Sequence, residues 1–194
     1  WMVLMPIFKD GRIINYSAMF GHMSDVGGKV PGSLPTNASS IWEEGIRIPP
    51  VKLYRRGVMN HDMLDVILHN VRMPRWNRSD LNALVASCRT AGKRCVELAE
   101  RFGDDLFYSA QQEMLDRTHR AMKEVIARVV PETRQEFVDY ICDDGVGFGP
   151  YTLRCALWRE GDKAIFDFEG TDPQAPSSVN FYVNEEMFKI FFGA

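Results

Sequence analysis

Hydrophobic residues near the start of the chain are concentrated in two runs, residues 3–8 and 12–20, that are rich in strand-favouring side chains. The dipeptide Asp10-Gly11 lies between these runs. Such a dipeptide is typical of the two-residue turn of a β-hairpin, because both of its residues adopt positive φ readily. The pattern therefore predicts an antiparallel hairpin over residues 3–20.

The segment after this hairpin is rich in glycine and proline. Between residues 21 and 35 these residues are frequent enough to exclude a regular element, so we expect an ordered or functional loop. Residues 41–51 are predicted to form short extended pieces, because Pro49 and Pro50 interrupt them.

From residue 61 the hydrophobic spacing becomes that of helices. A first helix is predicted over 61–71, where one face carries Met63, Leu64, Ile67, Leu68 and Val71. A second is predicted to begin at the capping pair Ser79-Asp80 and to end at Gly103, and a third to run from 104 to 129. Because a single glycine separates the last two helices, we expect an antiparallel helical hairpin.

The pattern returns to strands after Glu132. Strands are predicted over residues 135–142, 151–159 and 163–169, with turn residues between them. The fold class is therefore α+β, with hairpin and loops first, a helical hairpin next and antiparallel strands last. Along the chain, we expect a strand and loop region at 1–58, a helical region at 59–130, an antiparallel β region at 131–183 and the start of a truncated helix at 184–194.

Composition excludes several classes of protein. The net charge of −3 argues against a nucleic-acid-binding protein, which would carry a basic surplus. No apolar run reaches the roughly 18 to 20 residues that cross a membrane. The four cysteines, Cys88, Cys95, Cys142 and Cys155, are scattered without a CxxC pair. Reduced thiols in the cytoplasm are the expectation, and we expect the chain to be an internal segment of a longer polypeptide.

The best candidate for chemistry is the string from Gly21 to Gly28, which contains His22 and Asp25. Imidazole and carboxylate side chains three residues apart can turn toward one metal ion and together suit Mn, Fe, Ni or Zn. Gly21, Gly27 and Gly28 would let the backbone turn tightly beside that ion. The alternative is an ordered turn in which Asp25 accepts hydrogen bonds from backbone amides, and spacing alone favours this alternative.

Other residues are weaker candidates. The remaining histidines, His61, His69 and His119, lie on predicted helices or near a helix start, where surface roles are expected. The loop 145–149 is rich in glycine but precedes a strand, so it lacks the helix N-terminus that holds a phosphate. We therefore predict no nucleotide-binding site in this chain.

Four separated strings resemble one family in sequence order. They are Gly21-His22-Met23-Ser24-Asp25-Val26-Gly27-Gly28, Pro31-Gly32-Ser33-Leu34-Pro35, Glu44-Gly45-Ile46-Arg47-Ile48-Pro49-Pro50-Val51-Lys52-Leu53 and Phe166-Asp167-Phe168-Glu169-Gly170-Thr171-Asp172-Pro173-Gln174. Together they are similar to the hydantoinase B and acetone carboxylase large-subunit family. The sequence around residues 1–4 and 22–25 most resembles acetone carboxylase.

This resemblance implies a catalytic subunit that binds Mn²⁺ through His22, with further ligands expected upstream of Trp1 and Asp25 as a supporting residue or candidate ligand. It implies a hetero-oligomer in which ATP and Mg²⁺ bind a different subunit, and the ATP-dependent carboxylation of acetone with bicarbonate or CO₂ to acetoacetate. The metal would act there as a Lewis acid.

Two alternatives remain open at this stage. The same family implies ATP-dependent opening of hydantoin or 5-oxoproline rings, or carboxylation of an aromatic ketone. A different class of function is a non-catalytic assembly segment, in which the helical region docks partner subunits and His22 is only structural. Neither partners nor substrate include nucleic acid or a membrane in any of these interpretations.

Overall fold

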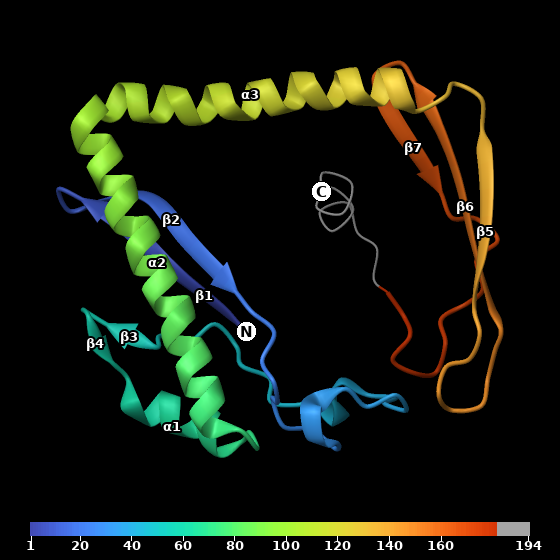
Figure 1. Ribbon diagram of the computed structural model, residues 1–194, viewed down its shortest axis with the longest axis horizontal. Helices are drawn as coiled ribbons and strands as arrows, with labels where there is room; N and C mark the ends of the chain where they lie inside the picture. The colour runs from blue at the N-terminus through green and yellow to red at the C-terminus, as the bar shows by residue number, and fades with distance from the viewer. Residues whose placement is uncertain (182–194) are drawn as a thin grey trace. The chain divides into compact units, whose positions relative to one another are not determined.

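The computed structural model describes residues 1–181 as two compact units, one formed by Trp1–Tyr108 and the other beginning at Ser109 (Figure 1). The helix predicted from residue 184 lies outside the described residues. Within residues 1–181, no helix combines the length and the apolar character required to cross a membrane.

The first unit contains the predicted hairpin. Strand β1 (Met2–Lys9) pairs antiparallel with β2 (Arg12–Phe20), and the register shifts between Ile7 and Phe8. Asp10 and Gly11 have φ values of 50° and 75°, as the two-residue turn requires. The hairpin prediction is confirmed.

Helix α2 (Pro74–Phe102) packs on one face of this hairpin (Figure 1). The core between them contains Ile7, Ile14, Ala99 and Phe107. Gly92 is the point of closest approach, because a Cβ built there would lie 2.7 Å from the Met5 Cε. The helix begins at Pro74 and not at the predicted Ser79-Asp80 cap; proline is favoured in the first helical turn because its missing N–H has no partner there in any case.

A second core lies around α1 (His61–His69), a helix that the sequence predicted. The Asn60 side chain caps it by accepting a hydrogen bond from the Met63 amide at 3.3 Å. The core residues are Leu64, Leu68, Val71 and Leu81. Four short elements precede α1 that the sequence did not predict. They are two 3-10 turns, at Pro31–Ser33 and Ile41–Glu43, and a small hairpin of β3 (Tyr54–Arg55) and β4 (Val58–Met59).

Helix α3 (Asp104–Val129) has the predicted bounds, and Phe107 is the one residue of this helix that is buried. Gly103, with a φ of 80° and a ψ of 156°, ends α2 and separates the two helices. Their antiparallel packing as a helical hairpin stays a prediction.

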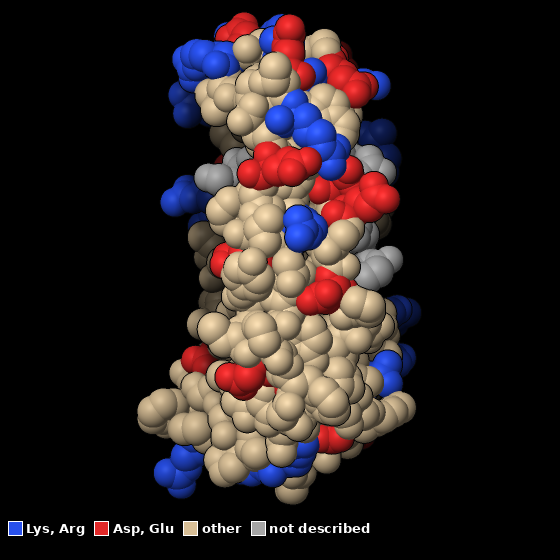
Figure 2. Space-filling view, turned by 90° about the vertical axis from the view of Figure 1, so that its right-hand side faces the viewer, with Lys and Arg blue, Asp and Glu red and all other residues tan. Residues whose placement is uncertain are grey.

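The second unit contains the predicted antiparallel sheet, in the order β5 (Gln135–Ile141), β6 (Tyr151–Glu160) and β7 (Lys163–Asp167). Figure 2 shows the side of the molecule on which β5 lies. The charged side chains visible on this side gather mainly in the upper half of the view, above a largely uncharged area. Exposed apolar residues on β5 include Phe137 and Tyr140.

Candidate functional site

The loop that follows β2 is organised around the carboxylate of Asp25, which is 1% exposed. Its Oδ1 accepts hydrogen bonds from the Gly27 amide at 2.9 Å and the Arg72 amide at 3.1 Å. Its Oδ2 accepts from the Gly32 amide at 2.9 Å and from Arg72 Nη1 at 3.1 Å. Burial alone would raise the pKa of Asp25, but these four donors outweigh it and hold the pKa well below its usual range.

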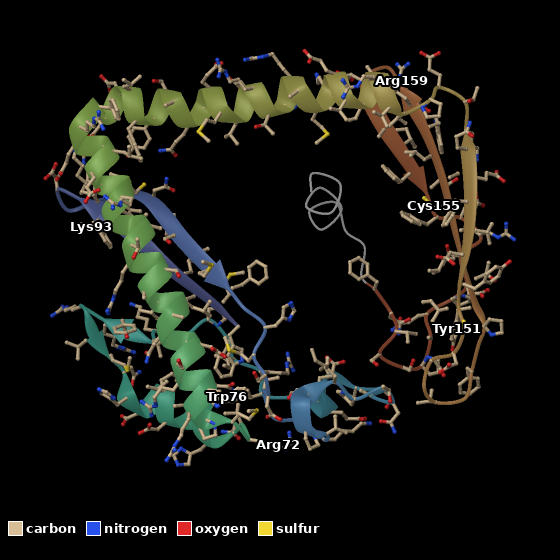
Figure 3. The ribbon with its side chains drawn as sticks, viewed as in Figure 1. Arg72, Trp76, Lys93, Tyr151, Cys155 and Arg159 are labelled. Carbon is tan, nitrogen blue, oxygen red and sulfur yellow. The ribbon has the colours of Figure 1, made fainter. Side chains whose placement is uncertain are left out.

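Arg72, in the link between α1 and α2, holds the same loop with its guanidinium. Besides Asp25, its Nη1 donates to the carbonyls of Gly27 at 3.2 Å and Val30 at 3.0 Å. Its Nη2 donates to the Gly28 carbonyl at 2.5 Å. Figure 3 labels Arg72 near the N-terminal end of α2. One arginine thus connects the helical link to three carbonyls and one carboxylate of the loop.

Two more side chains complete this framework. Ser33 Oγ donates to the Gly27 carbonyl at 2.6 Å and accepts from the Val26 amide at 2.7 Å. Asn77 on α2 is fully buried, and its Nδ2 donates to the Asp25 carbonyl at 2.5 Å. The Asn77 Oδ1 has no hydrogen-bond partner among residues 1–181.

Two of the predicted loop glycines are required by the geometry. Gly27 and Gly28 have φ values of 85° and 82°, in the region that disfavours L side chains. A Cβ on Gly27 would lie 2.5 Å from the Asn70 carbonyl oxygen, and one on Gly28 would lie 2.6 Å from the Glu43 carbonyl oxygen. The loop is therefore pressed against backbone on two sides.

Gly21 differs from these two. A Cβ there would meet Leu84 Cδ2 at 3.4 Å, which is an ordinary van der Waals contact. The Gly21 backbone instead continues the hairpin, since it exchanges hydrogen bonds with the backbone of Trp1 at 3.0 and 2.8 Å.

His22 lies between the end of the hairpin and this rigid loop, and its side chain is exposed. His22 and Asp25 therefore lie in opposite environments, and an Asp25 oxygen would have to give up an N–H partner before it could bind a metal. In the part of the chain that the structure describes, no three His, Cys, Asp or Glu side chains are grouped to hold a metal ion. The described residues alone do not fit a metal centre; a metal bound through His22 needs ligands from elsewhere.

The glycine-rich loop of the second unit uses its own amides. Asp144, also 1% exposed, accepts hydrogen bonds from the Val146 and Phe148 amides, each at 3.0 Å, and from the Tyr151 hydroxyl at 2.9 Å. Burial would raise the pKa of Asp144, but these donors lower it, whereas burial and the adjacent carboxylate raise the pKa of Tyr151. Two amides of this loop, those of Val146 and Phe148, are therefore already bonded to a carboxylate and not free for a phosphate.

Sequence reasoning missed Arg72, Ser33 and Asn77. Asn77 begins an Asn-Arg-Ser sequon, and Arg72 lies two residues before Pro74, where chain order gives no sign of a contact with a loop more than forty residues earlier. One usable signal exists: a polar Asn77 at the helical spacing of Leu81 and Val85 indicates a polar group facing a buried partner.

Comparison with known proteins adds a family to this geometry. The Hydantoinase B/oxoprolinase family matches residues 1–193, so the chain belongs to that family. Among its relatives, caprolactamase subunit beta from Pseudomonas jessenii is 30% identical over 97% of this chain and 32% of its own length. The acetophenone carboxylase delta subunit from Aromatoleum aromaticum is 27% identical over 92% of this chain and 26% of its own length.

Solved structures agree with the fold. A crystal structure of ATP-dependent caprolactamase from Pseudomonas jessenii matches with a TM-score of 0.82 and 31% identity over 93% of this chain. A nucleotide-free structure of acetone carboxylase matches with a TM-score of 0.79 at 20% identity, a likeness that shows the fold alone. The chain spans about a third or less of each of these relatives.

Proposed function

We propose that this chain is part of a catalytic subunit of an ATP-dependent enzyme complex that opens a cyclic amide. The family supports an ATP-dependent enzyme, and the caprolactamase likeness extends through both sequence and structure. A 5-oxoprolinase from Arabidopsis thaliana, 27% identical over 92% of this chain, is also named for a cyclic amide. In such a reaction the amide C–N bond breaks, water adds to the carbonyl carbon, and hydrolysis of ATP to ADP and phosphate drives the ring opening.

Ketone carboxylation is the second candidate. The acetophenone carboxylase relative favours it, and acetone carboxylation was the first expectation from the sequence. The acetone carboxylase likeness supports only the fold at 20% identity, so acetone itself has less support than a lactam. In either reaction, ATP and Mg²⁺ would bind a partner subunit. This assignment is supported by the glycine-rich loop at 145–149, in which the Val146 and Phe148 amides donate to Asp144.

The observation that carries a site in this chain is the rigid loop behind an exposed histidine. Asp25 and Arg72 fix residues 25–32 through buried hydrogen bonds and leave the His22 imidazole outside. His22 would supply one ligand to a Mn²⁺ ion, and polypeptide outside this chain would supply the others. Asp25 would then act by holding the loop, since its own oxygens are bonded to N–H groups.

The test uses the full-length subunit with its partner subunits and compares His22→Ala with His119→Ala, a second exposed histidine on α3. We expect near-stoichiometric transition metal by mass spectrometry in wild type and in the His119 variant, and loss of both metal and ATP-dependent turnover in the His22 variant. Unchanged metal and turnover in a folded His22→Ala subunit would refute the ligand role and favour the assembly-segment alternative.

Substrate class is tested separately on the same complex. Caprolactam, 5-oxoproline and hydantoin are compared with acetone and acetophenone plus bicarbonate, and ATP consumption is measured with product formation. We expect ATP consumption coupled to a ring-opened acid. Coupling to a carboxylated ketone alone would replace the first candidate with the second.

A further inference from the structure

The hairpin β1–β2 has one apolar face that no residue of the first unit covers. The paired residues on this outer face are Met2 with Phe20, Leu4 with Ala18, Pro6 with Tyr16 and Phe8 with Ile13. All eight are exposed, whereas the alternating residues Ile7, Ile14 and Ser17 are buried on the side of α2. Five of the outer residues, Met2, Leu4, Phe8, Tyr16 and Phe20, have more than half of their surface exposed, from 56% for Phe8 to 69% for Met2.

Charged side chains of the hairpin are confined to its turn. Lys9 and Arg12 lie there and contact Asp104, Lys9 at 2.5 Å and Arg12 at 3.9 Å. The outer face itself contains no charged residue. Exposed sheets usually carry lysine or other charges that prevent association, so an uncharged apolar face of this size indicates a surface that is covered in the assembled protein.

Among residues 1–181, no third strand pairs with either edge of this hairpin. Trp1 and Gly21 exchange both of their backbone hydrogen bonds, and such pairs alternate along an antiparallel ladder. By alternation, the backbone groups of Leu4 and Pro6 point away from β2, and Pro6 has no N–H to leave unpaired there.

We propose that this outer face packs against an apolar layer contributed by additional polypeptide of the same full-length subunit. The length of the relatives supports this occupant: this chain corresponds to 32% of caprolactamase subunit beta and 31% of the chain in the caprolactamase crystal structure. Most of each relative therefore lies outside the part that this chain matches. The other face of the hairpin is already occupied by α2 (Figure 1), which leaves the outer face for that polypeptide.

The layer also bears on the candidate site. His22 follows Phe20 by two residues, so polypeptide that covers Phe20 at the end of the outer face would lie near the exposed imidazole. The packing itself does not depend on the proposed activity, because it follows from the hairpin alone.

Hydroxyl-radical footprinting of the full-length wild-type subunit tests the proposal without any substitution. We expect Met2, Tyr16 and Phe20 to be strongly protected relative to Trp42 and Trp76, which are as exposed in this chain. Equal normalised reactivity of the two groups would overturn the proposal. Protection that disappears when the subunit is diluted to a monomer would also overturn it, because a second copy would then be the occupant.

A matched pair of variants provides a second readout. Leu4 and Val66 have similar exposure, 62% and 56%, but Val66 lies on α1. We expect Leu4→Lys to lower the melting temperature of the full-length subunit clearly more than Val66→Lys does. Equal, small shifts for both variants would show that Leu4 faces solvent in the subunit and would contradict the covered layer.

Discussion

At the scale of single residues, the candidate site depends on a charge that the protein has enclosed. The Asp25 carboxylate is buried, and four N–H donors replace the hydration that it has in the unfolded chain. One of these donors is on the half-exposed Arg72 guanidinium. Removing one partner of such a group leaves the others without their counterpart, which costs more than the intact interaction contributes.

Asp25→Asn is therefore expected to destabilise the subunit by about 3 kcal/mol, because an amide nitrogen would face N–H donors in place of an accepting oxygen. The control is Asp65→Asn, whose carboxylate lies 3.7 Å from Arg78 with more than half of its side chain exposed. Exposed pairs of this kind contribute less than about 1 kcal/mol. Urea unfolding measures both, and equal losses would contradict the role of Asp25.

The same residue predicts a direction for pH dependence. The pKa of Asp25 is lower in the folded state than in the unfolded state. The contribution of Asp25 to the free energy of unfolding is therefore fully present at neutral pH and is lost as pH falls below about 4 toward the folded-state pKa. We expect wild type to lose stability across this acid range more steeply than Asp25→Asn does, in unfolding curves recorded at successive pH values. Parallel curves would show that other carboxylates dominate.

Substitutions at two glycines of the loop distinguish the cost of a left-handed backbone conformation from the cost of steric crowding. Gly28 and Gly32 have φ values of 82° and 80°, but a Cβ on Gly28 would lie 2.6 Å from the Glu43 carbonyl oxygen, while one on Gly32 would meet nothing within 4 Å. Gly32→Ala should cost about 1–2 kcal/mol for the left-handed conformation alone. Gly28→Ala should cost clearly more in the same unfolding assay, and a smaller loss than for Gly32→Ala would disprove the close packing.

At the scale of elements, α2 and the hairpin meet most closely at Gly92. A Cβ there lies 2.7 Å from Met5 Cε, the flexible end of a side chain, and 3.6 Å from Ile7 Cγ1. Gly92→Ala should change stability little, since displacement of Met5 is offset by a helix propensity gain of up to about 1 kcal/mol. Gly92→Leu should destabilise by about 1–3 kcal/mol through overpacking. Thermal unfolding of both variants checks this, and a neutral Gly92→Leu would contradict it.

Elements with a local signal were predictable from the sequence, and elements defined by distant contacts were not. The β1–β2 hairpin follows from Asp10-Gly11, because the turn itself demands positive φ. The small β3–β4 hairpin has two residues per strand, too few to show a period. Helical spacing predicted the bounds of α3, but it indicates an apolar stripe without naming the element that covers it.

The same distinction explains what was predictable at the site. The Gly-His-x-x-Asp string identified the loop, since its residue types suit metal ligation, and the open alternative of a turn stabilised by Asp25 is what the hydrogen bonds display. Arg72 and Asn77 could not be assigned to it, because the contact of Arg72 with Asp25 spans 47 positions and that of Asn77 spans 52. Whether His22 binds metal stays a prediction.

At the scale of the whole molecule, the proposed binding of ATP to a partner subunit is the hypothesis that affects the most residues of this chain. The Val146 and Phe148 amides of the glycine-rich loop donate to Asp144, so these two amides are not free to bind a phosphate. Ligand binding to the native state stabilises a protein by about 2.7 kcal/mol at a hundred times Kd. The full-length subunit alone should therefore show no rise in melting temperature with Mg-ATP, whereas its complex with partner subunits should.

The decisive control is Asp144→Ala, which would remove the carboxylate from the Val146 and Phe148 amides. If the isolated wild-type subunit were stabilised by Mg-ATP, and Asp144→Ala changed that stabilisation, the nucleotide would bind at this loop and the assignment of ATP to a partner would be wrong. If neither isolated protein responds and the complex does, ATP chemistry belongs to the partner.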